Sequence, residues 1–253
     1  MSGDRISPEL KRLLKLLKLG KLLPTLPERL VLARQRSMPH QDFLELVLSD
    51  EAERRDRHSA QRRARMGGLD PNMLLEHWDD SAKVTYDKGL VAELATLRFV
   101  EDKRHMLVLG PVGVGKTFLA TAIAHIACRR RISVLMRRVD RLLKTLKACR
   151  LDNSYDKEMR RLISVDLLVL DDFGIDQLDA LESRDIYEII VERHRAGSMI
   201  VTSNRTPDEW LATMSDPLRA QSAIDRLHNA AYDLVIEGES YRKRQKPTWE
   251  KSP

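Results

Sequence analysis

Residues 110–117 carry the clearest chemical signal in the sequence. They read Gly-Pro-Val-Gly-Val-Gly-Lys-Thr, which satisfies the pattern G-x-x-x-x-G-K-[ST]. Glycines at these spacings let main-chain N–H groups curl around phosphate oxygens, while the lysine reaches the β- and γ-phosphates and the threonine hydroxyl reaches Mg²⁺. The motif therefore predicts a nucleoside triphosphate site. Its expected contacts are Gly110, Pro111, Val112, Gly113, Val114, Gly115, Lys116, Thr117 and Phe118.

Two aspartates follow the apolar run 167–170, about fifty residues after the phosphate loop. Ligands of open α/β sheets bind at the carboxyl ends of the strands, so both carboxylates should face the loop. Asp171 is the candidate Mg²⁺ ligand beside Thr117, and Asp172 is the candidate for orienting or activating the attacking water. An aspartate pair after a strand is by itself an ordinary turn, but a phosphate loop upstream favours the catalytic interpretation.

Asn204 follows another apolar run, 199–203. Its amide could hydrogen-bond the attacking water or the γ-phosphate. The sequence Asn-Arg-Thr-Pro at 204–207 is equally typical of a turn that leads into a helix, so the spacing leaves both interpretations open.

Alternating strands and helices must position these groups. Strands separated by helices predict right-handed crossovers and a parallel sheet covered on both faces. The expected strands are 105–109, 133–136, 167–170 and 199–203, and the expected helices are 116–130, further helices within 139–163, 180–196 and 217–230.

The composition of the chain excludes several classes of protein. With 253 residues and 42% hydrophobic residues, the chain is too apolar to be disordered. No apolar run approaches the roughly 18 residues of a membrane span, which predicts neither a transmembrane helix nor a secretory signal. Cys128 and Cys149 are isolated in the sequence, which argues against a disulfide framework and against a zinc site. We expect a cytoplasmic protein without a membrane partner.

Positive charge is concentrated at the N-terminus. Residues 1–66 carry 15 Lys and Arg against 9 Asp and Glu, whereas residues 67–253 carry 29 of each sign. Leucines at helical spacing over 10–17 predict a basic amphipathic helix, and a second helix is expected from Gln41 into the arginine-rich stretch that ends at Met66. A basic block favours nucleic acid as a partner, although the solvated face of a small helical bundle has about equal weight. The candidate DNA contacts are Arg54, Arg55, Arg62, Arg63 and Arg65.

The break Gly-Gly-Leu-Asp-Pro at 67–71 marks a domain boundary. It predicts a basic helical N-terminal domain over 1–68, for contacts with DNA or within an oligomer, and a nucleotide-binding domain over 69–253.

Together these motifs resemble those of AAA+ ATPases, and more closely the branch of DnaC-type helicase loaders and IstB-type insertion-sequence helpers. The resemblance rests on the phosphate loop and on four further motifs: Leu-Val-Leu-Asp-Asp-Phe-Gly at 168–174, Val-Thr-Ser-Asn-Arg at 201–205, Ala-Ile-Asp-Arg-Leu at 223–227 and Gly-Glu-Ser-Tyr-Arg at 238–242. The helical region from Asp42 to Arg65 looks like that of the IstB type. The resemblance implies an α/β AAA+ P-loop core of three layers with a five-stranded parallel sheet. Because the chain ends soon after Arg242, no C-terminal lid is expected.

The resemblance also implies an activity. An IstB-type helper would hydrolyse ATP with Mg²⁺, assemble with ATP into homo-oligomers on double-stranded DNA largely independently of sequence, and recruit or stimulate a cognate transposase. Arg226 matches the arginine finger that reaches a neighbouring subunit's γ-phosphate, with Arg219 as a rival, and Arg242 matches the second sensor. Asp172 stands where relatives carry glutamate, which predicts slow hydrolysis. The alternatives are a DnaC-type helicase loader and a nucleotide-gated binding module whose hydrolysis is vestigial.

Overall fold

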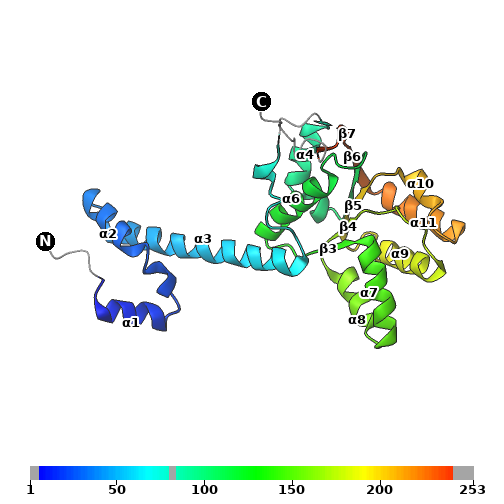
Figure 1. Cartoon of the computed structure of the whole chain (residues 1–253). Helices are drawn as coiled ribbons and strands as arrows, with labels where there is room; N and C mark the ends of the chain where they lie inside the picture. The colour runs from blue at the N-terminus through cyan, green and yellow to red at the C-terminus, as the bar shows by residue number, and fades with distance from the viewer. Residues whose placement is uncertain (1–5, 80–83, 242–253) are drawn as a thin grey trace, which may run out of the picture. The chain divides into compact units, whose positions relative to one another are not determined.

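The computed structural model describes residues 6–79 and 84–241. The chain divides into two compact units, Met1–Ser59 and Ala60–Pro253 (Figure 1). The division falls within helix α3 (His40–Gly67), shortly before the glycine pair that marks the predicted domain boundary. Ala64 already packs in the core of the second unit, so the last turns of this helix belong with that core.

The first unit is helical. Its elements are α1 (Pro8–Leu16), the short 3₁₀ helix η1 (Gly20–Leu22), α2 (Leu26–Gln35) and the part of α3 up to Ser59. The helix α2 was not predicted from the sequence, and Pro27 lies in its first turn. A proline is tolerated there because its missing N–H has no partner within the helix.

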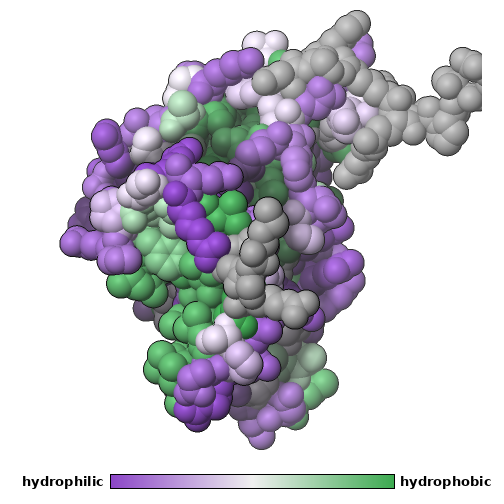
Figure 2. All heavy atoms as spheres, turned by 90° about the vertical axis from the view of Figure 1, so that its left-hand side faces the viewer, coloured by the Kyte–Doolittle hydropathy of each residue, from purple (hydrophilic) through white to green (hydrophobic). Residues whose placement is uncertain are grey.

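The core of the first unit is small. Leu22, Leu26 and Val47 are buried together, with Leu14 and Phe43 packed partly against them. The predicted amphipathic helix is present as α1, but it has no buried residue: Leu16 is 70% exposed and Leu17 63%. Figure 2 shows hydrophobic surface interspersed with hydrophilic side chains on the face turned to the viewer.

The second unit contains a five-stranded sheet in the order β3-β4-β5-β2-β6, in which every neighbouring pair is parallel. Its strands β2, β4 and β5 are buried at every residue, as expected for apolar runs covered on both faces. The strands are β2 (His105–Leu109), β3 (Val134–Arg138), β4 (Leu167–Asp171), β5 (Ser198–Ser203) and β6 (Ala231–Val235). The strand β6 was not predicted from the sequence, because this edge strand is only partly buried and forms no continuous apolar run.

Helices cover both faces of this sheet (Figure 1). One buried cluster joins α4 and α6 to the sheet, and the other joins α7, α8, α9 and α11 to the opposite face. The three-layer α/β architecture predicted from the sequence is therefore confirmed. The helices are α4 (Lys88–Ala95), α5 (Arg98–Glu101), α6 (Lys116–Arg129), α7 (Val139–Leu151), α8 (Tyr155–Ser164), α9 (Ala180–Arg193), α10 (Pro207–Leu211) and α11 (Pro217–His228).

Three helices, α6, α9 and α11, end earlier than predicted from the sequence, and a basic residue with left-handed backbone follows two of them. Arg131 follows α6 with φ 64°, and Arg195 follows α9 with φ 62°. A left-handed residue after the last turn closes a helix, but a residue other than glycine pays a steric cost there.

A short ribbon completes the described part of the chain. The strand β1 (Val84–Thr85) pairs antiparallel with β7 (Glu237–Gly238), and a 3₁₀ helix, η2 (Leu75–His77), precedes it. Across residues 6–79 and 84–241, the helices are all too short or too polar to span a membrane.

Candidate nucleotide site

The phosphate loop connects the carboxyl end of β2 to the start of α6. Gly113 and Gly115 have φ values of 86° and 100°, in the region that glycine adopts without strain. A Cβ atom on Gly115 would lie 2.7 Å from the Trp78 ring, and one on Gly113 would lie 2.1 Å from Ser240 Oγ. The curled loop therefore requires glycine at both positions.

Lys116 is held inside this loop. Its side chain is largely buried, and Nζ donates hydrogen bonds to the carbonyl oxygens of Gly110 (2.8 Å) and Pro111 (2.7 Å). The amino terminus of α6, a helix of 14 residues, begins at the same residue. An ammonium group and a helix N-terminus at one point form a strong attractor for phosphate.

The carboxylate of Asp171 lies beside the loop, as predicted. Asp171 is only 4% exposed, and its Oδ1 accepts hydrogen bonds from Thr117 Oγ1 at 2.8 Å and Thr202 Oγ1 at 2.6 Å. The strand β5 lies between β4, which ends at Asp171, and β2, which leads into the phosphate loop. Thr202 of β5 therefore lies between these two strands. Thr202 was not predicted from the sequence, although it is a polar residue directly after the apolar run 199–201 of β5.

Asp172 has a different environment. It adopts φ 58°, and its N–H donates to Thr202 Oγ1 at 3.0 Å. Its Oδ2 lies 3.5 Å from an Nη of Arg138, which pairs with Asp171 in the β3–β4 register. Burial and then the charge of Asp171 raise the pKa of Asp172, while Arg138 and Lys116 oppose this increase. A carboxylate with a raised pKa is better suited to accept a proton than an ordinary aspartate.

The remaining predicted groups of this site are less constrained. Asn204 is exposed directly after β5. Thr206 and Glu209 then form a capping box at the start of α10, so 204–207 is indeed a turn that leads into a helix. Arg242 and any segment that could form a lid lie outside the described residues. Tyr241 reaches the loop through its N–H, which donates to the Gly113 carbonyl at 2.8 Å.

The donor set fits a hard divalent cation with a triphosphate. Thr117 and Asp171 offer only oxygen ligands, which Mg²⁺ prefers, and phosphates and water complete its shell in such sites. Within the described ranges there is no group of three or more His, Cys, Asp or Glu side chains that could hold a metal without the nucleotide.

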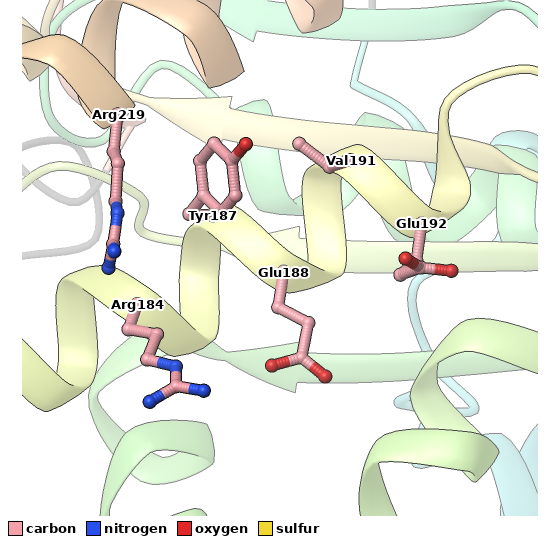
Figure 3. A pocket seen from close by; sticks show the side chains of 6 residues that line it. All are labelled: Arg184, Tyr187, Glu188, Val191, Glu192 and Arg219. Carbon is pink, nitrogen blue, oxygen red and sulfur yellow. The ribbon is translucent and has the colours of Figure 1, made fainter.

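The two candidate finger arginines lie on α11. Arg226 lies in the last turn, where Nη1 donates to the Ser222 carbonyl at 2.8 Å and to the Ser222 hydroxyl. Arg219 lies in the first turn of α11, and its Nε lies 3.3 Å from Asp216 Oδ2. Figure 3 shows its side chain over the outer face of α9, where it lines an open depression together with Arg184, Tyr187, Glu188, Val191 and Glu192.

The candidate DNA-binding arginines have unequal environments. Arg54 and Arg55 donate to the buried carboxylate of Glu51, and the hydrogen bond from Arg54 is the main cause that lowers the pKa of Glu51 to about 2. Arg63 donates to the Cys128 carbonyl at 3.0 Å. The other two candidates are exposed one turn apart on α3: Arg62 and Arg65.

The fold and the loop define the class of the protein. In the parallel sheet, β5 lies between β2, which leads into the phosphate loop, and β4, which ends at Asp171. Thr117 and Asp171 are paired at the carboxyl edge of this sheet. This arrangement is the core of an AAA+ P-loop protein. The family model of the IstB-like ATP binding proteins matches residues 12–248. The chain belongs to this family, and its core is an ATP-binding domain.

Relatives from insertion sequences match nearly the whole chain. A protein of Mycobacterium tuberculosis that is named for ATP binding in an insertion sequence is 34% identical over 241 residues, which cover 95% of this chain and 96% of the relative. The corresponding protein of insertion sequence IS21 from Pseudomonas aeruginosa is 31% identical, with 94% and 90% coverage.

Solved structures with lower identity share the fold of the core. The crystal structure of DnaI superposes with a TM-score of 0.56 at 23% identity and covers 64% of this chain and 90% of DnaI. The DnaC helicase loader gives a TM-score of 0.56 at 19% identity, with 66% and 97% coverage.

Proposed function

We propose that this protein hydrolyses ATP with Mg²⁺ as a helper of insertion-sequence transposition. In this proposal it assembles with ATP into homo-oligomers on double-stranded DNA, largely independently of sequence, and recruits or stimulates a cognate transposase. The observation that carries the proposal is the buried Asp171 carboxylate bonded to the phosphate-loop hydroxyl of Thr117, with the carboxylate of Asp172 beside it.

Each group of the site has a role in hydrolysis. Lys116 and the N-terminus of α6 bind the β- and γ-phosphates, and Thr117 and Asp171 would hold Mg²⁺, which supplies neutralisation of phosphate charge. Asp172 accepts the proton of the water that attacks the γ-phosphorus as the bond to the β–γ bridging oxygen breaks. Because its carboxylate also faces Arg138, the side chain must exchange this partner for the water, which is consistent with slow turnover. Asn204 orients the water or the γ-phosphate.

The basic face of α3 would bind DNA. Arg62 and Arg65 are exposed, whereas Arg54, Arg55 and Arg63 already donate to protein acceptors. We therefore assign the main phosphate contacts to Arg62 and Arg65, with the other three in supporting positions. A single subunit contributes few contacts, so assembly with ATP would multiply the affinity for the duplex.

Sedimentation and ATP turnover test this proposal. The full-length protein should form larger species on a duplex when ATP and Mg²⁺ are present, and the duplex should stimulate phosphate release. Lys116→Ala should lose both properties. The proposal would be contradicted if the wild-type protein stayed monomeric with ATP and duplex and its rate of ATP turnover did not change when DNA was added.

A helicase loader is the second candidate. The likeness of the core to DnaI and DnaC favours it, although identities of 23% and 19% support the fold alone. Pull-down with a hexameric replicative helicase separates the two functions: stable capture together with preference for single-stranded DNA would establish the loader, and capture of the transposase with preference for duplex would establish the helper.

A further inference from the structure

The five-stranded sheet ends at β3 on one side and at β6 on the other (Figure 1). The outer side of β3 is covered by the chain itself. A Cβ atom on Gly67, at the end of α3, would lie 2.6 Å from the Val134 carbonyl oxygen. The next outward carbonyl of β3, that of Met136, accepts a hydrogen bond from Arg137 Nη1 at 2.7 Å. By contrast, β2 is the only strand that pairs with β6 within the described part of the chain.

The register of β6 shows which of its main-chain groups point away from the sheet. The ladder with β2 begins at the His105 N–H, which donates to the Ala230 carbonyl at 2.8 Å. Alternate residues of a parallel strand bond to the same neighbour, so the even-numbered residues of β6 bond to β2 and the odd-numbered ones point outward. We call the outward N–H and C=O groups the open edge, and they belong to Ala231, Asp233 and Val235.

The open edge has little of the protection that edge strands usually carry. Prolines, bulges, charged side chains or a covering segment normally prevent such a strand from pairing with another chain. The sequence of β6 has no proline, and its register with β2 continues over all five residues without a bulge. Tyr232 is 41% exposed and Val235 is 48% exposed. The carboxylate of Asp233 is the single charge on this strand.

The charge of Asp233 limits what can pair with the open edge. Its Oδ2 lies 2.9 Å from His228 Nε2, and Oδ1 has no hydrogen-bond partner among the described residues. A second copy of β6 that paired antiparallel over all five residues would place two Asp233 carboxylates directly opposite each other, which is destabilising. The next charged residue, Glu237, is also acidic and exposed. The open edge is therefore complementary to a strand that carries a basic side chain.

We propose that the open edge binds an extended segment of the cognate transposase, which adds a strand to the sheet beside β6. Main-chain hydrogen bonds supply affinity in this kind of recognition, and alternate side chains supply specificity. Asp233 points to the face of the sheet that carries α11, because it contacts His228 of that helix, and Val235 shares this face. The segment therefore carries a Lys or Arg opposite Asp233 and an apolar residue opposite Val235.

This inference rests on the proposed recruitment of a transposase and deepens it, because it names the surface of the protein that the transposase contacts and the chemistry of the segment that binds there.

Amide hydrogen exchange of the full-length protein tests the strand addition directly. The N–H groups of Ala231, Asp233 and Val235 should exchange rapidly in the free protein and at least about tenfold more slowly with the transposase bound, as expected for new hydrogen bonds. The N–H groups of Tyr232 and Leu234 already bond to β2 and should change much less. A transposase that docked through side chains alone would not produce this alternation.

Asp233→Pro blocks the open edge at its centre. The change removes an outward N–H and the carboxylate but no hydrogen bond to β2, and proline is tolerated where the N–H of an edge strand faces solvent. The variant should therefore unfold at a urea concentration close to that of the wild type and keep its ATP turnover without transposase. Its affinity for the transposase should fall at least about tenfold, as measured by fluorescence anisotropy.

Asp233→Arg tests the charge without changing the main chain. Overlapping synthetic peptides that cover the cognate transposase identify the segment. The identified peptide should bind Asp233→Arg at least about tenfold more weakly than it binds the wild type, and replacement of its basic residue by Glu should restore binding to this variant. Asp156→Arg is the matched control: it reverses an exposed aspartate in the first turn of α8 and should bind the peptide like the wild type.

Several outcomes would overturn the inference. Equal binding of the transposase by the wild type, Asp233→Pro and Asp233→Arg would place the contact elsewhere, as would outward N–H groups that exchange no more slowly in the complex. Outward N–H groups that become protected as the concentration of this protein alone is raised would show pairing between two copies. If the wild-type protein binds no transposase at all, the proposed function fails as well, whereas normal binding by both variants contradicts the inference alone.

Discussion

Thr202→Val removes a hydroxyl group on which both aspartates of the site depend. Thr202 Oγ1 donates to Asp171 Oδ1 at 2.6 Å and accepts from the Asp172 N–H at 3.0 Å, and Thr202 is fully buried. Valine has nearly the same shape, so the change removes hydrogen bonds without opening a cavity. A bond to a charged acceptor contributes about 1.5–3 kcal/mol and a neutral one about 0.5–1.5 kcal/mol. We expect the free energy of unfolding of the second unit to fall by about 2–4 kcal/mol.

The assays are urea unfolding and the Mg²⁺ dependence of ATP turnover. With a slope of about 2–3 kcal/mol per molar urea, the midpoint should fall by about 1 M. The Asp171 carboxylate keeps its bond from Thr117 but loses its second hydroxyl donor, so half-maximal turnover should require more Mg²⁺. Thr202→Ser keeps the hydroxyl group and should lose clearly less stability than Thr202→Val.

Thr213 offers a matched control for this prediction. It is 1% exposed, and its hydroxyl donates a single hydrogen bond, to the Trp210 carbonyl at 2.7 Å. Thr213→Val should cost about 1 kcal/mol and leave the Mg²⁺ dependence unchanged. Equal stability of the valine and serine variants at Thr202 would refute the reasoning, because the hydroxyl group would then contribute nothing.

Three other predictions concern charge. Because the pKa of Glu51 is about 2 in the folded state against an ordinary 4.5, its stabilising effect is present above about pH 4.5 and lost as the pH falls toward 2; Glu51→Gln should flatten this part of the acid-unfolding curve followed by circular dichroism. Arg62→Gln with Arg65→Gln should reduce the slope of log affinity for duplex against log salt by about 2, and Arg54→Gln should change it much less. Lys116→Ala should abolish ATP binding in calorimetry, and retained binding would remove the lysine from the site.

The predictions from the sequence were most accurate where the signal is local. The order of β2, α6 and β4 follows from apolar runs of the right length. Four of the five strands of the sheet were located within a few residues. The edge strand β6 and the helix α2 were missed. The strand lacks a continuous apolar run, and the helix carries Pro27 in its first turn, where a proline is easily taken for a helix break.

The roles of individual side chains depended on partners distant in the sequence. Arg54 and Arg55 look like free cations in the sequence, but both donate to Glu51, whose burial no local pattern reveals. Thr202, inside β5, donates a hydrogen bond to Asp171, and this contact was not predicted from the sequence.

The sequence by itself determined the class of the core and the kind of ligand. The glycine pattern at 110–115 and the Lys-Thr pair that follows it can be recognised without neighbours, because a phosphate is bound mainly by a short continuous segment of backbone and the first turn of one helix. Only the tertiary structure decided which groups share a site. Thr117, Asp171 and Thr202 come from three segments that are far apart in the sequence. Their meeting depends on the order of strands in the sheet, which long-range packing decides and local spacing does not encode.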